Sequence, residues 1–413
     1  MTISEPLSQY KEICKAAIQN SIKESVAKLP KTFQKLLIEI LTLYMILPRK
    51  INFTQMARYG SHCEQTYRSN FNRKRKECVD WLLLNLSLAR CVLNMTDLLV
   101  IAIDPSYISK AGNKTPHIGR FWSGCAGAVK HGLEIMGIGL VDVNQNKCMM
   151  LRAHQTLGSS ALKMRDKSLV DYYISVMKRY SRKLLQITDI VVADAFFSTS
   201  TFEKDIRNLG FHLVSRFRDN ACLHYLYTGT RTGKPGRPKM LDGKIDFNKL
   251  DYARIELMHV DGLDGKAYTL EAYARAMKRK VRLVIWRMPN GRCKLFFSTK
   301  LTMKGEEVLK AYRSRFQIEF AFREGKQFAG LMDCQARHKR QLDFAFNASL
   351  ASLNAAKVFI KHNSMDNSIA NVKSLMFNTH YAKSIFDVSR YRPNRNLISK
   401  IFKKLIGWQP IAA

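Results

Sequence analysis

Two short apolar runs restrict the fold of this chain more than any other feature of its sequence. Residues 98–103 (Leu-Leu-Val-Ile-Ala-Ile) and 190–193 (Ile-Val-Val-Ala) contain no polar side chain. Each run is too short for a buried helix and has the length of a strand covered on both faces. Patterns of helical period follow at 168–182 and 201–209. Strands that alternate with helices predict an α/β core.

Each apolar run is followed directly by an aspartate, Asp104 or Asp194. We expect the first strand to end at Asp104-Pro105, because proline cannot continue a β-ladder. Local explanations exist for both residues, since Asp104 could open a turn and Asp194 could cap the next helix. Open α/β sheets also place their ligands at the carboxyl ends of strands. The alternative is therefore that both carboxylates face a functional site.

A third acidic residue lies in a helical pattern over 306–328. At about 100° per residue, several polar side chains share a stripe about 60° wide. The stripe, with Arg323 at its border, consists of Tyr312, Arg315, Glu319 and Lys326. One carboxylate among such groups suits metal binding beside bound phosphates, whereas an exposed Arg315–Glu319 ion pair is the plain alternative. With the two aspartates, Glu319 would make three hard oxygen ligands, which favour Mg²⁺ or Mn²⁺ over zinc.

The charge of the chain indicates a polyanionic partner. Lys and Arg number 68 against 33 Asp and Glu, which gives a formal net charge of +35. Nucleic acid relieves such an excess because each neutralised phosphate releases a counterion; a merely basic protein or a membrane-surface binder is the alternative. The longest apolar stretch, 36–47, is 12 residues long and contains Glu39, so no membrane span is expected. The nine cysteines lack C-x-x-C spacing and the chain begins without a secretory pattern, which favours a cytoplasmic protein.

Three further segments have recognisable local patterns, and two of these patterns have more than one interpretation. Residues 53–76 predict two short helices around Gly60 with a basic end, either a helix-turn-helix or two ordinary helices. The loop at 228–239 has a Gly-Arg-Pro centre that suits a narrow minor groove or is simply solvated. Residues 281–299 predict a β-hairpin that turns at Pro289-Asn290-Gly291. No G-x-S-x-G elbow, P-loop or dinucleotide fingerprint occurs.

Taken together, these residues resemble the DDE transposases of bacterial insertion sequences. The resemblance rests on Asp104 in Ile-Ala-Ile-Asp-Pro-Ser, Asp194 in Val-Val-Ala-Asp-Ala-Phe-Phe-Ser and a Tyr-Arg-Glu-Lys signature, Y-x2-R-x3-E-x6-K, at 312, 315, 319 and 326. The segment 211–218 is similar to that group as well, and the whole covers about residues 98–345. It implies a ribonuclease-H-like fold in which the first and fourth strands are neighbours. Asp104 and Asp194 would then lie side by side, with the Glu319 helix packed across them.

The resemblance also implies an activity, cofactors and partners. Asp104, Asp194 and Glu319 would be the catalytic and metal-binding residues, with two Mg²⁺ (or Mn²⁺) ions, for cleavage and transfer of DNA strands. The DNA-binding residues would be Tyr312, Arg315, Lys326, Arg216, Arg323 and Trp286, the last because family members often stack a flipped base on a tryptophan of the insertion. The partners would be transposon-end DNA with its inverted repeats, target DNA and a second copy of the chain, with no membrane and no small-molecule substrate. The location would be the bacterial cytoplasm, on the nucleoid when the protein is bound to DNA.

The expected organisation has a discontinuous catalytic core. A helical N-terminal DNA-binding domain is expected over 1–95, the core over 96–218 and 304–345, a β-rich insertion over 219–303, and a helical C-terminal region, a candidate for dimerisation, over 346–413. Two other functions stay open. A structure-selective or repair nuclease on the same fold would need the three acids but no inverted repeats. An inactive, domesticated DNA-binding descendant would not need the acids, and all three are present.

Overall fold

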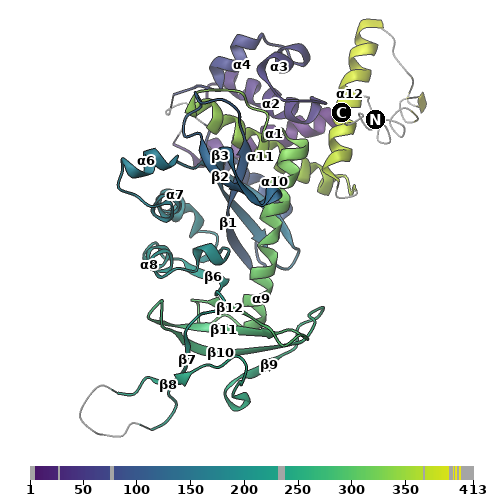
Figure 1. Cartoon of the computed structure of the whole chain (residues 1–413). Coiled ribbons are helices and arrows are strands. Elements are labelled where there is room, and N and C mark those ends of the chain that lie inside the picture. Colours follow the sequence, from purple (N-terminus) through teal and green to yellow (C-terminus); the bar gives the residue numbers. More distant parts are fainter. Residues whose placement is uncertain are drawn as a thin grey trace.

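The computed structural model describes residues 5–26, 28–74, 79–230, 238–365 and 368–389, with a few single positions up to 400. Figure 1 shows helices gathered at one end, a β-rich part at the other end and a mixed α/β region between them. The centre of the Gly-Arg-Pro loop, the last residues of the basic segment at 73–76 and most of the tail from residue 390 lie outside the described residues. In the part of the chain that is described, no helix is both long enough and apolar enough to cross a bilayer.

The central sheet has the strand order and directions of a ribonuclease-H-like fold, as predicted. Strand β1 (Leu99–Ser109) pairs antiparallel with β3 (Ala128–Asp142), and β3 pairs antiparallel with β4 (Lys147–Gln155) and with the short β2 (Gly119–Ser123). On its other side β1 runs parallel to β5 (Ile190–Val192), and β5 runs parallel to β6 (His212–Arg216). When the short β2 is left out of the count, β1 and β5 are the first and fourth strands of the core, and they are neighbours.

A second group of strands continues this sheet beyond β6. Strand β12 (Cys293–Ser298) pairs antiparallel with β6 and with β11 (Arg279–Arg287), which confirms the predicted hairpin. The remaining strands of this part are β7 (Leu223–Leu226), β8 (Leu241–Lys244), β9 (Glu256–Met258) and β10 (Lys266–Ala274). Because β12 pairs directly with β6, the β-rich part is joined to the core through one continuous sheet.

Helices cover both faces of the core sheet. One face packs against α7 (Leu169–Leu184) and α8 (Ser200–Asn208), with the short α6 (Ser159–Lys163) before them. The other face packs against α9 (Gly305–Ser314) and α10 (Phe316–Phe328). Gly137 on β3 permits the close approach of α10, because a Cβ there would collide with the ring of Phe322. Short 3-10 turns occur at Gly124–Ala126, Ala195–Phe197 and Tyr252–Arg254.

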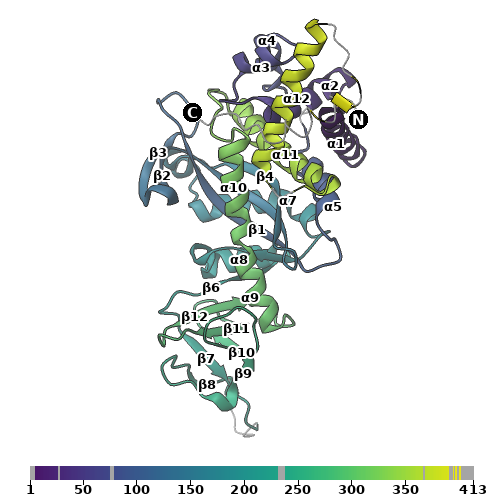
Figure 2. The same ribbon diagram turned by 90° about the vertical axis from the view of Figure 1, so that its right-hand side faces the viewer.

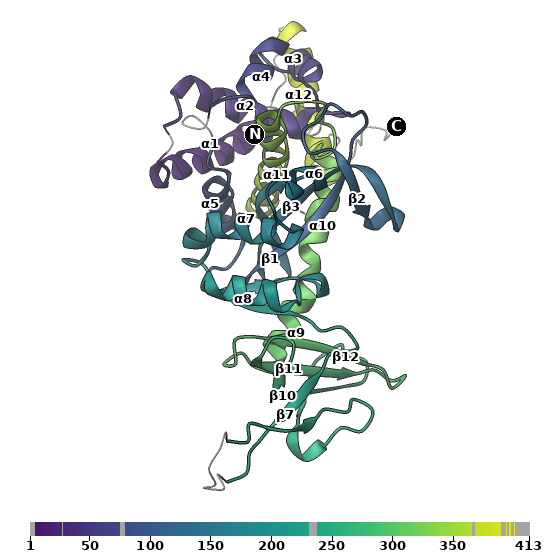
Figure 3. The same cartoon turned by 60° about the vertical axis from the view of Figure 1, so that its left-hand side comes forward.

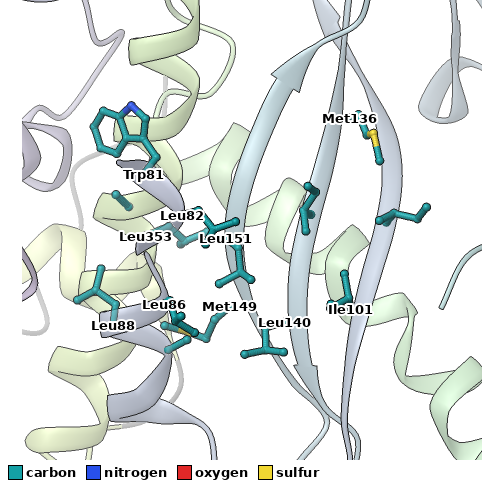
Figure 4. Close-up of a cluster of buried hydrophobic side chains, with 14 of the residues drawn as sticks. Trp81, Leu82, Leu86, Leu88, Ile101, Met136, Leu140, Met149, Leu151 and Leu353 are labelled. Atoms are coloured by element: carbon teal, nitrogen blue, oxygen red, sulfur yellow. The ribbon is translucent and has the colours of Figure 1, made fainter. Parts of the chain in front are cut away.

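The N-terminal helices share one hydrophobic core with the sheet and the C-terminal helices. These helices are α1 (Glu5–Glu24), α2 (Lys31–Ile46), α3 (Phe53–Tyr59), α4 (Glu64–Asn70), α5 (Trp81–Val92), α11 (Lys339–His362) and α12 (Ile369–Ser389). In Figure 4, leucines of α5 and Leu353 of α11 meet Met149 and Leu151 of β4. Asn347 and Asn354 of α11 each accept from and donate to the backbone of β4, at Ala153 and Met150. The central helix α11 thus covers the edge strand of the sheet.

Two predictions about element bounds are wrong. Strand β1 does not end at Asp104-Pro105 but continues to Ser109, with Pro105 opposite Met136. Beyond Ala102, β1 has no paired residue in β5, so the missing N–H of the proline costs no ladder bond on that side. The helix expected over 306–328 is interrupted at Arg315, whose N–H bonds to the carbonyl of Tyr312 in a tighter 3-10 pattern.

Candidate active site

The register of two parallel strands brings Asp104 and Asp194 to the same level. Ala102 of β1 lies opposite Val192 of β5, so the residue two positions further along each strand is an aspartate. Because side chains alternate between the faces of a strand, both carboxylates are expected on the face of Ala102 and Val192. That face is covered by α10, since Ala102, Val192 and Ile318 belong to the same buried cluster.

Asp104 lies in a largely buried group of charged side chains. Its side chain is only 16% exposed, and a guanidinium nitrogen of Arg315 lies 3.4 Å from its Oδ1. Burial raises the pKa of Asp104 to about 7; the charge of Arg315 opposes this rise, and the carboxylates of Glu319 and Asp194 add to it. Three acidic groups are thus near enough to influence one another, as expected where a cation is to be bound.

Arg315 contacts an acidic residue of the sheet, Asp104, and one of helix α10, Glu319. Its Nη2 lies 2.9 Å from the Oε1 of Glu319 while its Nη1 faces Asp104. The plain i,i+4 ion pair is therefore present, with the Arg315 side chain 8% exposed and that of Glu319 40% exposed. The buried Nε–H of Arg315 meets no acceptor among the described residues. It is thus an unsatisfied buried donor on a cationic group, which is uncommon in folded proteins.

Asp194 has a local role as well as its place beside Asp104. Its Oδ1 accepts a hydrogen bond of 3.0 Å from the N–H of Phe196, which caps the 3-10 turn after β5. The hydroxyl of Ser215 on β6 donates to its carbonyl oxygen at 2.9 Å. Asp194 thus caps the 3-10 turn and not the next helix, because the N-cap of α8 is Thr199. The two bonds fix the backbone of Asp194 at the end of its strand.

The two other cationic residues near the acids differ in their surroundings. Arg216 ends β6, and its buried Nε–H also meets no acceptor in the described part of the chain. Burial raises the pKa of Tyr312, and the charges of Arg315 and Arg216 oppose this, so Tyr312 lies beside both arginines. Burial lowers the pKa of Lys326, and Cys125 and Asp104 oppose that shift. Lys326, in the last turn of α10, is therefore also near Asp104.

Two predicted DNA-binding residues lie outside this cluster. Arg323 is exposed and packs its guanidinium 5.0 Å from the ring centre of Phe320, on the outer side of α10. Trp286 on β11 is partly buried, and its indole N–H donates to the carbonyl of Asp264 at 2.7 Å. The ammonium of Lys294, directly opposite on β12, lies 5.0 Å from the indole ring centre. Trp286 is thus a packed strand residue with one ring face beside a lysine.

A row of aromatic and basic side chains joins Trp286 to the acid cluster. Lys294 and Phe296 share one face of β12 because they are two residues apart. Phe296 lies opposite Arg216 on β6 and contacts the ring of Tyr312, with 4.9 Å between ring centres. Phe296 is itself buried, so the row runs from the partly exposed Trp286 and Lys294 through a packed aromatic contact to Tyr312.

The carboxylates suit a divalent cation in chemistry but are not gathered into a formed metal site. Among the described residues, no three His, Cys, Asp or Glu side chains converge closely enough to hold a metal ion. The guanidinium of Arg315 instead supplies positive charge between Asp104 and Glu319. The donor set of three hard oxygens and the raised pKa of Asp104 fit a divalent ion.

One acidic residue near the cluster was missed by sequence reasoning. Glu134 on β3 is buried, and its Oε1 accepts a hydrogen bond of 2.6 Å from the hydroxyl of Tyr173 on α7. Its charge is among those that raise the pKa of Asp104. The available signal was a single acid at the start of the otherwise apolar segment 133–141.

Comparisons with known proteins agree with this geometry. A family model described as DDE superfamily endonuclease matches residues 27–254, more than half of the chain, and includes Asp104 and Asp194. A second, described as transposase DDE domain, matches residues 170–355 and includes Asp194 and Glu319. A search of curated proteins gave no match. DDE transposases act on DNA and generally use divalent metal ions. The chain belongs to the DDE superfamily of transposases and endonucleases, and it is an enzyme that acts on DNA.

Proposed function

We propose that the protein binds the terminal inverted repeats of its own mobile element and performs Mg²⁺-dependent strand cleavage and strand transfer. The observation that carries this proposal is the contact of Arg315 with both Asp104 and Glu319, with Asp194 near enough to raise the pKa of Asp104, on a fold shared with the DDE superfamily. Because two ends must be cut and joined, two copies of the chain would act together in the complex.

In this proposal Asp104, Asp194 and Glu319 would hold two divalent ions, and the chemistry that these would supply is activation of the attacking oxygen and stabilisation of charge on the leaving oxygen. Asp104 would give up its proton when the divalent ions bind, because its pKa lies near neutrality. The guanidinium of Arg315 would orient Glu319 through their 2.9 Å contact. The unsatisfied Nε–H groups of Arg216 and Arg315, both near Tyr312, would donate to a phosphate oxygen.

Lys326 would contact a neighbouring phosphate. It lies seven residues after Glu319 on α10, which is about 10 Å along the helix axis. Its ammonium therefore does not contact the same phosphate oxygen as the groups at Glu319. Trp286 and Lys294 would line the path of the same DNA over the β-rich part, and Arg323 would contact it only from the outer side of α10.

The end-reading element in this proposal is the pair α3–α4. Their turn is fixed by Glu39 of α2, whose Oε1 accepts from the N–H of Ser61 and from the hydroxyl of Tyr67, both at 2.6 Å. Gly60 lies so close to Tyr67 that a Cβ there would collide with its hydroxyl. Helix α4 leaves Gln65, Arg68 and Ser69 exposed. A rigid turn and an exposed polar second helix support the helix-turn-helix reading.

The test uses DNA that flanks the gene and carries matched inverted repeats. Asp104→Asn, Asp194→Asn and Glu319→Gln should each bind this DNA about as well as the wild type but lose cleavage. Each replacement removes a ligand charge with little change in shape. Cleavage by any of these variants at near the wild-type rate in Mg²⁺ would contradict the assignment. Cleavage of the wild-type substrate without joining of the ends would favour the nuclease alternative.

A further inference from the structure

The β2–β3 hairpin extends beyond the core sheet at the edge where the acids lie. Strand β3 pairs with β1 over Gly132–Asp142, but with β2 over Ala128–Gly132. The four residue steps from Gly132 to Ala128 therefore carry the hairpin about 14 Å past the end of β1. Figure 3 shows β2 standing clear of the body beside α10, and Figure 2 shows the same hairpin next to α10 from another side.

The exposed end of this hairpin carries a pair of large apolar side chains. Trp122 lies directly opposite Val129, and they are 60% and 56% exposed. Two residues along each strand, Arg120 lies opposite His131, and both are exposed. By the alternation of side chains, all four share one face of the ribbon. An indole and a valine left in water on a narrow two-stranded ribbon indicate a surface that is covered by a partner.

The charge of residues 105–133, which include the hairpin, indicates that the partner is a polyanion. Residues 105–133 contain no Asp or Glu, although the whole chain has 33 such residues. The same segment contains Lys110, Lys114, Arg120 and Lys130. Such a ribbon attracts phosphate and repels basic protein surfaces, including those of a second copy of this chain.

The position of the hairpin relates it to the acids. Lys326 has both Asp104 and Cys125, in the turn between β2 and β3, among the groups near its ammonium. The turn is therefore close to the part of α10 that faces the acid cluster. A duplex with a phosphate at Asp104 would pass this ribbon.

We propose that the β2–β3 hairpin is a wedge that distorts the DNA duplex being cut. Arg120 and His131 contact backbone phosphates, and Trp122 with Val129 enters the base stack. Val129 lies eight residues along β3 from Gly137, the partner of Asp104, which is about 27 Å along the strand. Apolar side chains that enter between base steps unstack and kink a duplex, and aromatic rings bind exposed bases by stacking. This role rests on the proposed function, because it requires that the substrate is duplex DNA at the acid cluster.

The experiment compares two probes with the full chain in the absence of divalent metal. One probe is a perfect 40-bp duplex that contains the inverted repeat and the other has a single thymine mismatch at its centre, which lowers the cost of unstacking. The wild type should prefer the mismatched duplex and make its thymine reactive to permanganate. Trp122→Ala should weaken binding to that probe about tenfold and lose the preference, while Trp122→Phe should keep most of both. Leu257→Ala, at a 51% exposed position of β9, serves as the matched control and should resemble the wild type.

The outcomes separate this role from the proposed function. Equal preference and equal permanganate reactivity in the wild type and Trp122→Ala would overturn the wedge and leave DNA binding intact. Failure of the wild type to bind either probe would overturn the proposed function and the wedge with it. If Trp122→Ala lowers the molar mass of the DNA-free protein by light scattering, the hairpin is a contact between copies and the wedge is wrong. Unchanged thermal unfolding of Trp122→Ala verifies that the variant is folded.

Discussion

Arg315 supplies the positive charge of an acid cluster that would otherwise be self-repelling. Its side chain is almost fully buried between Asp104 and Glu319, and its helix is tightened at that residue. The sequence predicted these side chains as one stripe on a regular helix. It did not predict the tightening or the ion pair with Asp104, because both depend on contact with a strand that lies 211 residues away in the chain.

The raised pKa of Asp104 predicts how metal affinity depends on pH. Because its pKa is about 7, protons compete with a divalent ion below that pH, so affinity for Mn²⁺ should increase up to about pH 7 and then level off. In the metal-free protein the folded state binds more protons between the unfolded pKa and pH 7. Asp104 therefore makes the free energy of unfolding fall as pH rises through that window. Calorimetric Mn²⁺ titrations from pH 5.5 to 8.5 measure the first effect.

Asp104→Asn is the control for this pH dependence. Its residual Mn²⁺ affinity should be low and should vary little between pH 6 and 8, since the titrating group is absent. A wild-type affinity that is constant over pH 5.5–8.5 would contradict the assignment of Asp104 as a ligand.

A comparison of variants at Lys326 and at its neighbour Gln327 distinguishes the loss of a phosphate contact from a general disturbance of α10. Gln327 is exposed, whereas Lys326 is half-buried near Asp104. Lys326→Ala should weaken assembly of the end complex about tenfold or more, and added Mg²⁺ should not restore it. Gln327→Ala should assemble normally in the same gel-shift assay. Normal assembly and cleavage by Lys326→Ala would contradict the assignment of Lys326 as a phosphate contact.

At the scale of elements, local patterns predicted most strands and helices correctly, but not their long-range partners. The apolar runs and the turn at Pro289-Asn290-Gly291 gave β1, β5 and the β11–β12 hairpin. The order of β1 and β5 came from the family resemblance. The packing of α1, α2 and α5 into one core with α11 could not be predicted, because it is built from leucines and alanines whose partners are set only by the tertiary fold.

The turn of α3–α4 offers a test of the reading element. Glu39→Ala removes the acceptor of Ser61 and Tyr67, which should cost about 1–3 kcal/mol locally. Discrimination between the inverted repeat and an unrelated duplex should fall, while binding to the unrelated duplex should change little. Glu12→Ala is the matched control, because Glu12 is exposed on α1 and its ion pair within the described part of the chain is with Lys15. Unchanged discrimination in Glu39→Ala would mean that the sequence is read elsewhere.

Helix α12 is attached through a buried lysine. The ammonium of Lys373 donates to the carbonyls of Tyr44 and Phe328, and burial lowers its pKa to about 8, with Asp333 opposing. The unfolded chain keeps this proton to higher pH, so the free energy of unfolding should rise between pH 8 and 10. The rise should reach about 3 kcal/mol at most. Lys373→Met should flatten this part of a denaturant-unfolding series, and an equal slope in both proteins would contradict it.

For the whole molecule, the net charge of +35 becomes informative when it is placed on the fold. The acid-free segment 105–133, the basic row from Lys294 to Arg216 and the end of α10 all surround the acid cluster. A negative centre within a positive surface suits an enzyme that holds a polyanion by its backbone and cuts it at one phosphate. The composition alone indicated a polyanionic partner. The fold adds which surface of the protein that partner would follow.

This path predicts which charges determine the salt dependence of DNA binding. The logarithm of the binding constant falls by about 0.9 per contacted phosphate for each decade of salt. The double variant Arg216→Gln, Lys326→Gln should therefore reduce the slope by about 1.8. The triple variant Lys15→Gln, Lys178→Gln, Lys204→Gln removes one more charge, but at exposed positions away from the acids, and should leave the slope near that of the wild type. Filter binding of one duplex at several salt concentrations measures both. If slope followed only the number of charges removed, DNA would be held by net charge, and the surface around Asp104 would not be its path.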